Sequence, residues 1–368
     1  MKLLYSTSLN KYRLFFIQSL TVIVLLLNSC SLPEIETIAG TGVAGTLDGP
    51  AMEARLNNPF GIVRGPDNAL WFCEYDGHTV RKIDAAGEIT TIVGNGEPGH
   101  TGDGGSAIEA RLNRPHEIRF DSNGQLYIAD MSNHAIRKVD LTTGQISTIA
   151  GMGDAGFSGD GGPAIQAHLN QSHSIQFGPD GNLYIADVGN HRVRVIDMKT
   201  GLIRTLAGNG ETSPTPDGKP FRDVPLNGPR SLDFGKRGDL WLVLKYANQI
   251  YRLDMGLGTI HHIAGTGELG FTGNGGDARL ATLSGPKGIA IAPNGNVYVA
   301  DTESHSVRMI DTKTGIIDVV VGTGERFDGK DGDPLQCGLA RPHGIFVEKD
   351  GTVLIGDSEN HRIRLLRP

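Results

Sequence analysis

The sequence has no long run of helix-forming residues, and it has few cysteines and tryptophans. Its 368 residues include 3 cysteines and 2 tryptophans, whereas glycine accounts for 52. This glycine follows no Gly-X-Y period, which excludes a collagen-like chain. Short segments rich in Val, Ile, Leu and Tyr lie between clusters of Gly, Asn and Asp instead. This pattern is typical of many short strands and predicts an all-β protein.

The sequence has no excess of positive charge, because 41 Asp and Glu outnumber 34 Lys and Arg and the formal net charge is −7 at neutral pH. Nucleic-acid binding needs clustered Lys and Arg to meet the phosphates, so we expect no nucleic-acid partner. No Ser-His-Asp arrangement and no reactive-cysteine motif is visible. Cys73 and Cys337 either form a disulfide in an oxidising compartment or remain two free buried thiols.

Residues 1–29 are predicted to be a leader separate from the folded domain. A positively charged start precedes an almost wholly apolar run over 14–27. This run is short for a transmembrane helix and is typical of a secretory signal. The leader contributes three positive charges and no negative charge, so the remaining chain is still more acidic.

The segment LNSC at 27–30 resembles the bacterial lipobox, in which the cysteine is lipidated after cleavage. The resemblance implies a lipoprotein signal peptide over 1–29, a lipid on Cys30, and a short tether over 30–34. It implies an exported, membrane-anchored protein of the cell envelope that touches the membrane only through this lipid. Ser31 rather than Asp follows the cysteine, which favours the outer membrane.

A short apolar segment followed by glycines recurs six times: TIAG at 37, TIVG at 91, TIAG at 148, TLAG at 205, HIAG at 262 and VVVG at 319. Four of these segments run into GxGxxG, which alone would suggest a dinucleotide-binding turn. One chain does not need four such fingerprints in register, and no long helices are available for βαβ units. We therefore interpret the glycines as connectors between repeated units.

Each unit contains three further apolar strands separated by turns, so that it offers four antiparallel strands in all. This period is the signature of a propeller blade. The sixth copy ends at 368 without its fourth strand, whereas a spare one, IETIAG at 35–40, precedes the first copy. The sequence predicts a six-bladed β-propeller over 35–368 whose last blade is closed by the N-terminal strand, which removes open sheet edges.

The pairs Asn133-His134, Asn190-His191 and Asn360-His361, each followed by aliphatic and basic residues, resemble the NHL repeat. The connector GFSGDGGPA is similar to connectors in the NHL propellers of teneurins. The resemblance implies a six-bladed propeller. It also implies a binding role, because most NHL domains bind rather than catalyse.

One position in each blade is expected to rim the central channel, on the face that carries the long connectors. It is the residue after the proline, or after Ser172, that opens the innermost strand: Phe60, His116, His173, Arg230, Lys287 and His343. Neutral imidazoles bind transition metals, and Arg and Lys bind carboxylate or phosphate oxygens. The ring therefore predicts an anion or metal site.

Other recurring polar residues are predicted to be structural. The histidines that share one blade position are expected to form hydrogen bonds between strands: His78, His134, His191, His305 and His361. The recurring aspartates are expected to be blade residues: Asp130, Asp187, Asp301 and Asp357. Asp103 and Asp160 lie in connectors that lack the spacing of a calcium loop, and they are interpreted as turn formers.

Blade four departs from the repeat. We align Lys245 with the Asp or Glu of other blades, and Gln249 with their His. Arg230, Lys245 and Tyr246 are expected to form a basic, hydrogen-bonding patch beside the channel and, with Lys287, to bind an anionic ligand.

The segments around three ring histidines also resemble the Pro-His-x-aliphatic segments of peptidylglycine amidating lyase and streptogramin lyase propellers. That resemblance implies that His116, His173 and His343 hold one divalent metal, such as zinc. The nearest general acid and base candidates are Glu117, Glu74 and Tyr75.

Two functions follow from these features. The first is a lipid-anchored binding module that meets a protein partner or a small anionic ligand through its long-loop face and cationic channel mouth. The second is a metal-dependent lyase or hydrolase in which a His-bound metal polarises a carbonyl or activates water. Fold alone does not choose between them.

Overall fold

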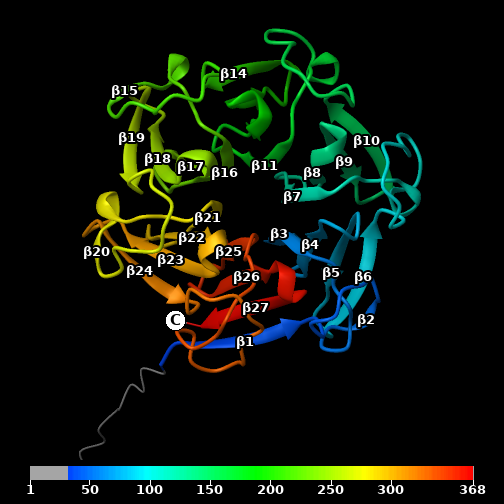
Figure 1. The fold of residues 1–368 in the computed structure, drawn as a ribbon. Coiled ribbons are helices and arrows are strands. Elements are labelled where there is room, and N and C mark those ends of the chain that lie inside the picture. The colour runs from blue at the N-terminus through cyan, green and yellow to red at the C-terminus, as the bar shows by residue number, and fades with distance from the viewer. Residues whose placement is uncertain (1–31, 368) are drawn as a thin grey trace, which may run out of the picture. The chain divides into compact units, whose positions relative to one another are not determined.

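The repeat units fold as six antiparallel sheets arranged around one axis, in a computed structural model that describes residues 32–367 (Figure 1). The predicted all-β propeller with six blades is confirmed. The innermost strands of blades one to six are β3 (Pro59–Arg64), β7 (Pro115–Phe120), β11 (Ser172–Phe177), β16 (Pro229–Phe234), β21 (Pro286–Ile291) and β25 (Ile345–Val347). The second strands are β4 (Leu70–Glu74), β8 (Leu126–Asp130), β12 (Leu183–Asp187), β17 (Leu240–Leu244), β22 (Val297–Asp301) and β26 (Val353–Asp357).

Two further strands complete each blade outward from the channel. The third strands are β5 (Thr79–Ile83), β9 (Ala135–Asp140), β13 (Arg192–Ile196), β18 (Gln249–Asp254), β23 (Ser306–Asp311) and β27 (Arg362–Arg367). The fourth are β6 (Glu88–Val93), β10 (Gln145–Ala150), β14 (Ile203–Ala207), β19 (Thr259–Ala264) and β24 (Ile316–Val321) for blades one to five. Two-residue strands flank three of these edges: β2 (Gly49–Pro50), β15 (Lys219–Pro220) and β20 (Gly276–Asp277).

The N-terminal strand β1 (Glu34–Ala39) closes blade six, as predicted. It pairs antiparallel with β27, with Glu34 opposite Arg367 and Thr37 opposite Arg364. Figure 1 shows β1, in blue, beside β27, in red. The pairing gives the backbone of β27 a partner on its outer side and joins the two ends of the described chain in one sheet.

The hydrophobic core consists of clusters between neighbouring blades. A leucine ahead of each innermost strand is fully buried in these clusters: Leu56, Leu112, Leu169, Leu226, Leu283 and Leu339. The cluster around Leu112, for example, contains Val80 of blade one and Ile128 of blade two. Because each blade buries its apolar faces only against its neighbours, the ring is stabilised as a unit.

A buried acid and a buried arginine recur inside the blades. In blade two, Arg137 Nη1 lies 3.2 Å from Asp130 Oδ2, and both side chains are fully buried. The same arginine donates to Asp103 Oδ1 of the connector at 2.7 Å. Arg194 bonds Asp187 and Asp160 in the same way in blade three. The interpretation of Asp103 and Asp160 as turn formers is therefore incomplete, because each fastens its connector to the arginine of the following blade.

Blade four lacks this pair, and its alignment needs a correction. Pro229 pairs with Leu244, as Pro115 pairs with Asp130, so Leu244 rather than Lys245 occupies the position of the acid. Tyr251, whose hydroxyl donates to Thr215 O, occupies the position of the arginine. Both charges are thus replaced together, which avoids an unpaired buried ion.

The recurring histidines link neighbouring blades. Each adopts a left-handed backbone conformation, and its Nδ1 accepts a hydrogen bond from a backbone N–H in the loop of the next blade. Their predicted structural role is confirmed, but the expected bonds between strands are wrong, because the partner is a loop of the next blade. In blade four, Asn248 has this conformation and its Oδ1 accepts from Gly285 N, so Asn248, not Gln249, stands at the histidine position.

Cys73 and Cys337 are free, buried thiols, so the alternative without a disulfide is confirmed. The predicted leader, the lipid site at Cys30 and the start of the tether lie outside the described residues. Within residues 32–367, no helix is long and apolar enough to cross a membrane.

Candidate functional site: the channel mouth

The six predicted ring residues lie around one channel. The innermost strands of blades two to five are irregular at their start. In each of them the residue after the first is skipped in the pairing with the second strand, as His116 is between Pro115 and Glu117. Such a bulge re-aims a side chain. The six side chains are nearly buried, with exposed fractions between 4% (Phe60) and 9% (His343). The sequence-based placement of this ring is confirmed.

The ring side chains fill the channel at this level. The cavity that they enclose, lined also by the strand starts beneath them, is about 10 Å³. This volume accommodates about one water molecule. A ligand therefore does not pass through the channel here, and the site is its mouth on the long-connector face.

Aromatic contacts fix four of the six ring residues. Phe60 stacks on His343 with ring centroids 4.0 Å apart, and Tyr75 stacks on Phe60 at 4.6 Å. His116 meets Phe60 edge-on at 4.8 Å and His173 edge-on at 4.6 Å. These contacts hold the imidazole planes and keep one wall of the mouth apolar.

Arg230 crosses the channel and has no carboxylate partner among residues 32–367. Its Nη2 lies 2.7 Å from His116 Nε2, two blades away, and its Nε is buried without any hydrogen-bond partner. Burial lowers the pKa of Arg230 to about 10. A buried cation without a counter-ion is costly, and an oxyanion is the partner that matches a guanidinium.

Lys287 brings a second cation to the mouth. Its Nζ donates to Glu303 Oε1 at 2.6 Å, but the same oxygen also accepts from Arg341 Nη2 at 2.7 Å. Burial and the Arg230 charge lower the pKa of Lys287 to about 7. Burial alone would raise the pKa of Glu303, but hydrogen bonds from Arg341 and Lys287 lower it to about 2.

Lys245 and Tyr246 form the outer part of the same patch. They lie on the short helix η6 (Lys245–Ala247), and Lys245 Nζ lies 4.9 Å from the Tyr246 ring centre. Tyr246 is 51% exposed. Burial, with Arg230 next in effect, lowers the pKa of Lys245 to about 8. Arg230 thus lowers the pKa of both lysines, and Glu303 raises both. The acid that raises the pKa of Arg230 is Glu117, which is ion-paired with Arg119.

The three ring histidines are neutral near pH 7. Burial is the main cause that holds the pKa of each well below its usual value, followed by Arg230 for His116 and His173 and by Lys287 for His343. Within residues 32–367, no three His, Cys, Asp or Glu side chains are arranged to hold a metal ion. Nε2 of His116 also forms a hydrogen bond with Arg230, so this nitrogen is not available to a metal. The ring does not fit a metal in this arrangement, and the three-histidine metal site stays a prediction without structural support.

The candidate acids and bases have other partners. Glu74 is the buried acid of blade one and accepts from Arg81, Asn57 N and Thr79. Glu117 forms a close ion pair with Arg119 beneath the ring. Tyr75 packs on Phe60 at the mouth. The catalytic assignment of these three residues stays a prediction.

Sequence reasoning missed Arg341 and Glu303. Arg341 Nη1 also donates to Glu359 Oε1 at 2.6 Å, so this arginine lies between two acids from neighbouring blades. Arg341 stands two residues before His343, and Glu303 lies on the short helix η8 (Thr302–Ser304). The repeat does not predict their ion pair, because the charges of Arg341 and Glu303 meet only through the packing of blades five and six.

Comparisons with known proteins agree with this architecture. Residues 95–156 and 266–338 match the teneurin NHL domain, and residues 169–196 and 339–364 match the NHL repeat. The chain belongs to the NHL-repeat propellers. Protein SUPPRESSOR OF QUENCHING 1 of Arabidopsis thaliana is 31% identical over 293 residues, which are 76% of this chain and 27% of that protein. This NHL propeller thus spans about a quarter of the length of that relative.

Solved structures share the fold at low sequence identity. An auxiliary nutrient binding protein from Bacteroides thetaiotaomicron superposes with a TM-score of 0.69 at 17% identity, over 91% of this chain and 76% of its own. Virginiamycin B lyase from Staphylococcus aureus superposes with a TM-score of 0.55 at 16% identity, over 92% of this chain and 100% of its own. Such likeness shows the fold alone, and the two neighbours are a binding protein and a lyase, so the fold does not choose between the two functions.

Proposed function

We propose that this NHL propeller is a binding module whose channel mouth holds a carboxylate or phosphate group, presented by a small ligand or by an acidic segment of a protein partner. The observation that carries the proposal is Arg230, a nearly buried guanidinium with no carboxylate partner among the described residues. Lys245 and Lys287 add positive charge beside it, and Glu303 already serves both Lys287 and Arg341.

The geometry favours an acidic group that approaches from the long-connector face. The enclosed cavity of about 10 Å³ admits no ligand body, so only the acidic group would reach the ring. The exposed Tyr246 ring lies beside this approach and offers apolar area and a hydroxyl to the rest of the ligand. Export as a lipid-anchored protein of the cell envelope remains part of the proposal, on the lipobox resemblance alone.

The lyase or hydrolase alternative is the weaker one. It needs a metal at His116, His173 and His343, and the cations Arg230 and Lys287 disfavour a metal ion at the same place. Of the three imidazoles, that of His116 instead forms a hydrogen bond with Arg230, and Nδ1 of His343 bonds the backbone oxygen of Arg341.

Thermal unfolding with and without phosphate or citrate tests the proposal. A ligand that binds only the folded state raises its stability, so the melting temperature should rise with anion concentration. Arg230→Met should lose this rise, whereas Arg222→Met, at an exposed arginine on η5 (Phe221–Asp223), should keep it. An equal rise in all three proteins would show that the anions act generally and would reject the channel mouth as the site.

A further inference from the structure

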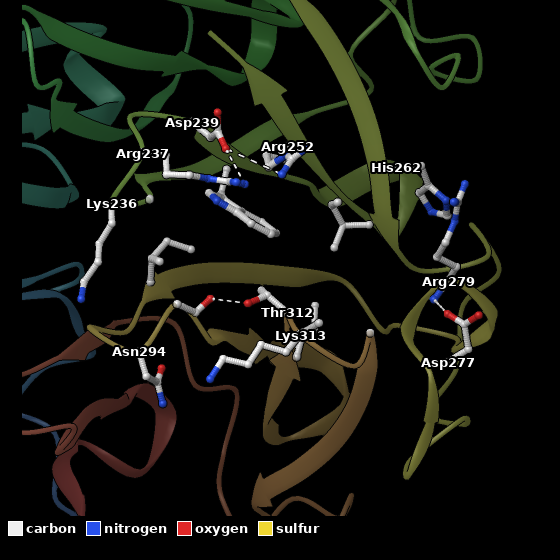
Figure 2. A pocket seen from close by; sticks show the side chains of 17 residues that line it. Lys236, Arg237, Asp239, Arg252, His262, Asp277, Arg279, Asn294, Thr312 and Lys313 are labelled. Carbon is white, nitrogen blue, oxygen red and sulfur yellow. Dashed lines mark hydrogen bonds and ion pairs between the residues drawn. The ribbon is translucent and has the colours of Figure 1, made fainter. Parts of the chain in front are cut away.

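A second cavity lies between blades four and five, away from the channel mouth. Its volume is about 650 Å³, which is within the usual range for small-molecule sites. The turn between β16 and β17 and the turns of blade five line it, and it extends to the outer edge near β20 (Figure 2). The channel mouth, by contrast, lies on the long-connector face.

Positive charge dominates the lining of this inter-blade pocket. Its lining includes two carboxylates, those of Asp239 and Asp277, and five cationic side chains: Lys236, Arg237, Arg252, Arg279 and Lys313. Of these, Arg279 already has a counter-ion, because its Nη2 donates to Asp217 Oδ2 at 2.7 Å. In Figure 2, Lys236 and Lys313 extend from opposite blades toward the same end of the pocket, and Arg279 lies at the other end. The arrangement suits an elongated molecule with more than one acidic group.

Blade one has an aspartate in the turn between its first two strands that blade four lacks. In blade one, Asp67 accepts from the indole of Trp71 at 2.9 Å and from Lys82 at 3.3 Å. Trp241 and Arg252 occupy the same positions in blade four and pair across the strands as Trp71 and Lys82 do. The residue four before the tryptophan is Arg237 instead of an aspartate.

This exchange leaves donors without acceptors. The indole N–H of Trp241 has no acceptor among residues 32–367, and Arg252 Nε is buried without a partner. Asp239 compensates only in part, since its Oδ2 lies 3.5 Å from Arg237 and 3.7 Å from Arg252. A place that holds a carboxylate in blade one is therefore lined in blade four by an indole N–H, two guanidinium groups and the single Asp239 carboxylate, which lies beyond normal hydrogen-bond distance of Arg252.

We propose that the inter-blade pocket is a second ligand site, specific for a small organic molecule with two or more oxyanion groups. One group takes the place that the Asp67 carboxylate holds in blade one, between Trp241, Arg237 and Arg252. A second group binds Lys236 and Lys313 at the far end. The apolar wall formed by Ile263, Ile291 and Ile310 contacts the body of the ligand.

Calorimetric titration with three probes tests this site: digalacturonate as a dicarboxylate, glucose 1,6-bisphosphate as a diphosphate, and cellobiose as a neutral control. We expect saturable binding of at least one anionic probe and none of cellobiose. The better anionic probe decides between a carboxylated and a phosphorylated ligand. Absence of saturable binding by both anions at millimolar concentration would overturn the proposal.

Arg237→Asp is the decisive variant, because it rebuilds the turn of blade one and supplies the pocket with its own carboxylate. Its side chain is 79% exposed, and blade three carries Asp180 at the same position, so the fold tolerates it. We expect probe affinity to fall about tenfold or more. Lys236→Ala should also weaken binding, whereas Lys349→Ala, at the same turn position in blade six, should not.

Unchanged affinity in both Arg237→Asp and Lys236→Ala would refute the site even if the probe binds elsewhere. The variant Arg230→Met distinguishes binding in the inter-blade pocket from binding at the channel mouth. Probe affinity that falls with Arg230→Met but not with Arg237→Asp would assign the binding to the mouth and overturn the inter-blade proposal.

Discussion

Replacing Arg230 with methionine should stabilise the protein in the absence of ligand. Methionine keeps an unbranched stem of similar reach in the channel but removes the charge. Arg230 is 4% exposed, so solvent screens its charge little, and its side chain forms a hydrogen bond with the neutral His116. A residue that binds a ligand can lower the stability of the unliganded protein, because selection for binding outweighs the loss of stability.

The pKa of Arg230 shows how much its charge destabilises the folded protein. It falls from 12.5 to about 10, chiefly because of burial. At about 1.4 kcal/mol for each pKa unit, the folded state disfavours the charged form by roughly 3 kcal/mol. Loss of the contact with His116 offsets about 1 kcal/mol of the gain, so Arg230→Met should unfold with a free energy about 2 kcal/mol higher than the wild type.

Urea unfolding at neutral pH and low salt, followed by tryptophan fluorescence, measures this difference. The gap between the two proteins should narrow when citrate or phosphate is added, because only the wild type gains an anion at the channel mouth. A variant that is less stable than the wild type by more than about 1 kcal/mol would refute the reasoning. It would mean that the protein itself satisfies Arg230, and that no anion is needed there.

Two further predictions follow from buried charges. Lys287 has a pKa of about 7 in the folded protein, against 10.5 for an ordinary lysine. Between these two pH values the unfolded chain binds a proton on this lysine that the folded chain does not. The free energy of unfolding therefore rises with pH by up to about 1.4 kcal/mol per pH unit. Urea unfolding at pH 7 and pH 9.5 should show this rise in the wild type and a smaller one in Lys287→Met; equal slopes would contradict it. In blade two, Arg137→Met leaves the buried Asp130 carboxylate without its ion-pair partner. Urea unfolding should show a free energy of unfolding about 3–5 kcal/mol lower than that of the wild type. The double variant D130L/R137Y, which copies Leu244 and Tyr251 of blade four, should recover at least about half of that loss, and a double variant no more stable than the single one would disprove the exchange of the pair as a unit.

The architecture was predictable from the printed residues alone. Strand and turn signals are local, and a period of about one blade repeats them six times, so the blade count and the closure by β1 followed from the printed residues. The ring of Phe60, His116, His173, Arg230, Lys287 and His343 followed as well, because equivalent positions in a closed ring point at one axis.

Tertiary structure decided the register inside blade four and the partners of each charge. Leu244 and Lys245 are adjacent in sequence, and only the pairing of Pro229 with Leu244 shows which of them replaces the buried acid. The contact of Arg230 with His116 joins positions 114 residues apart, across a channel whose width depends on how the blades pack. The inter-blade pocket depends in the same way on turns from two blades that carry no shared motif. Hydrophobic periodicity specifies strands and their order, whereas the distance between charged side chains of different blades is set by packing, which no local pattern encodes.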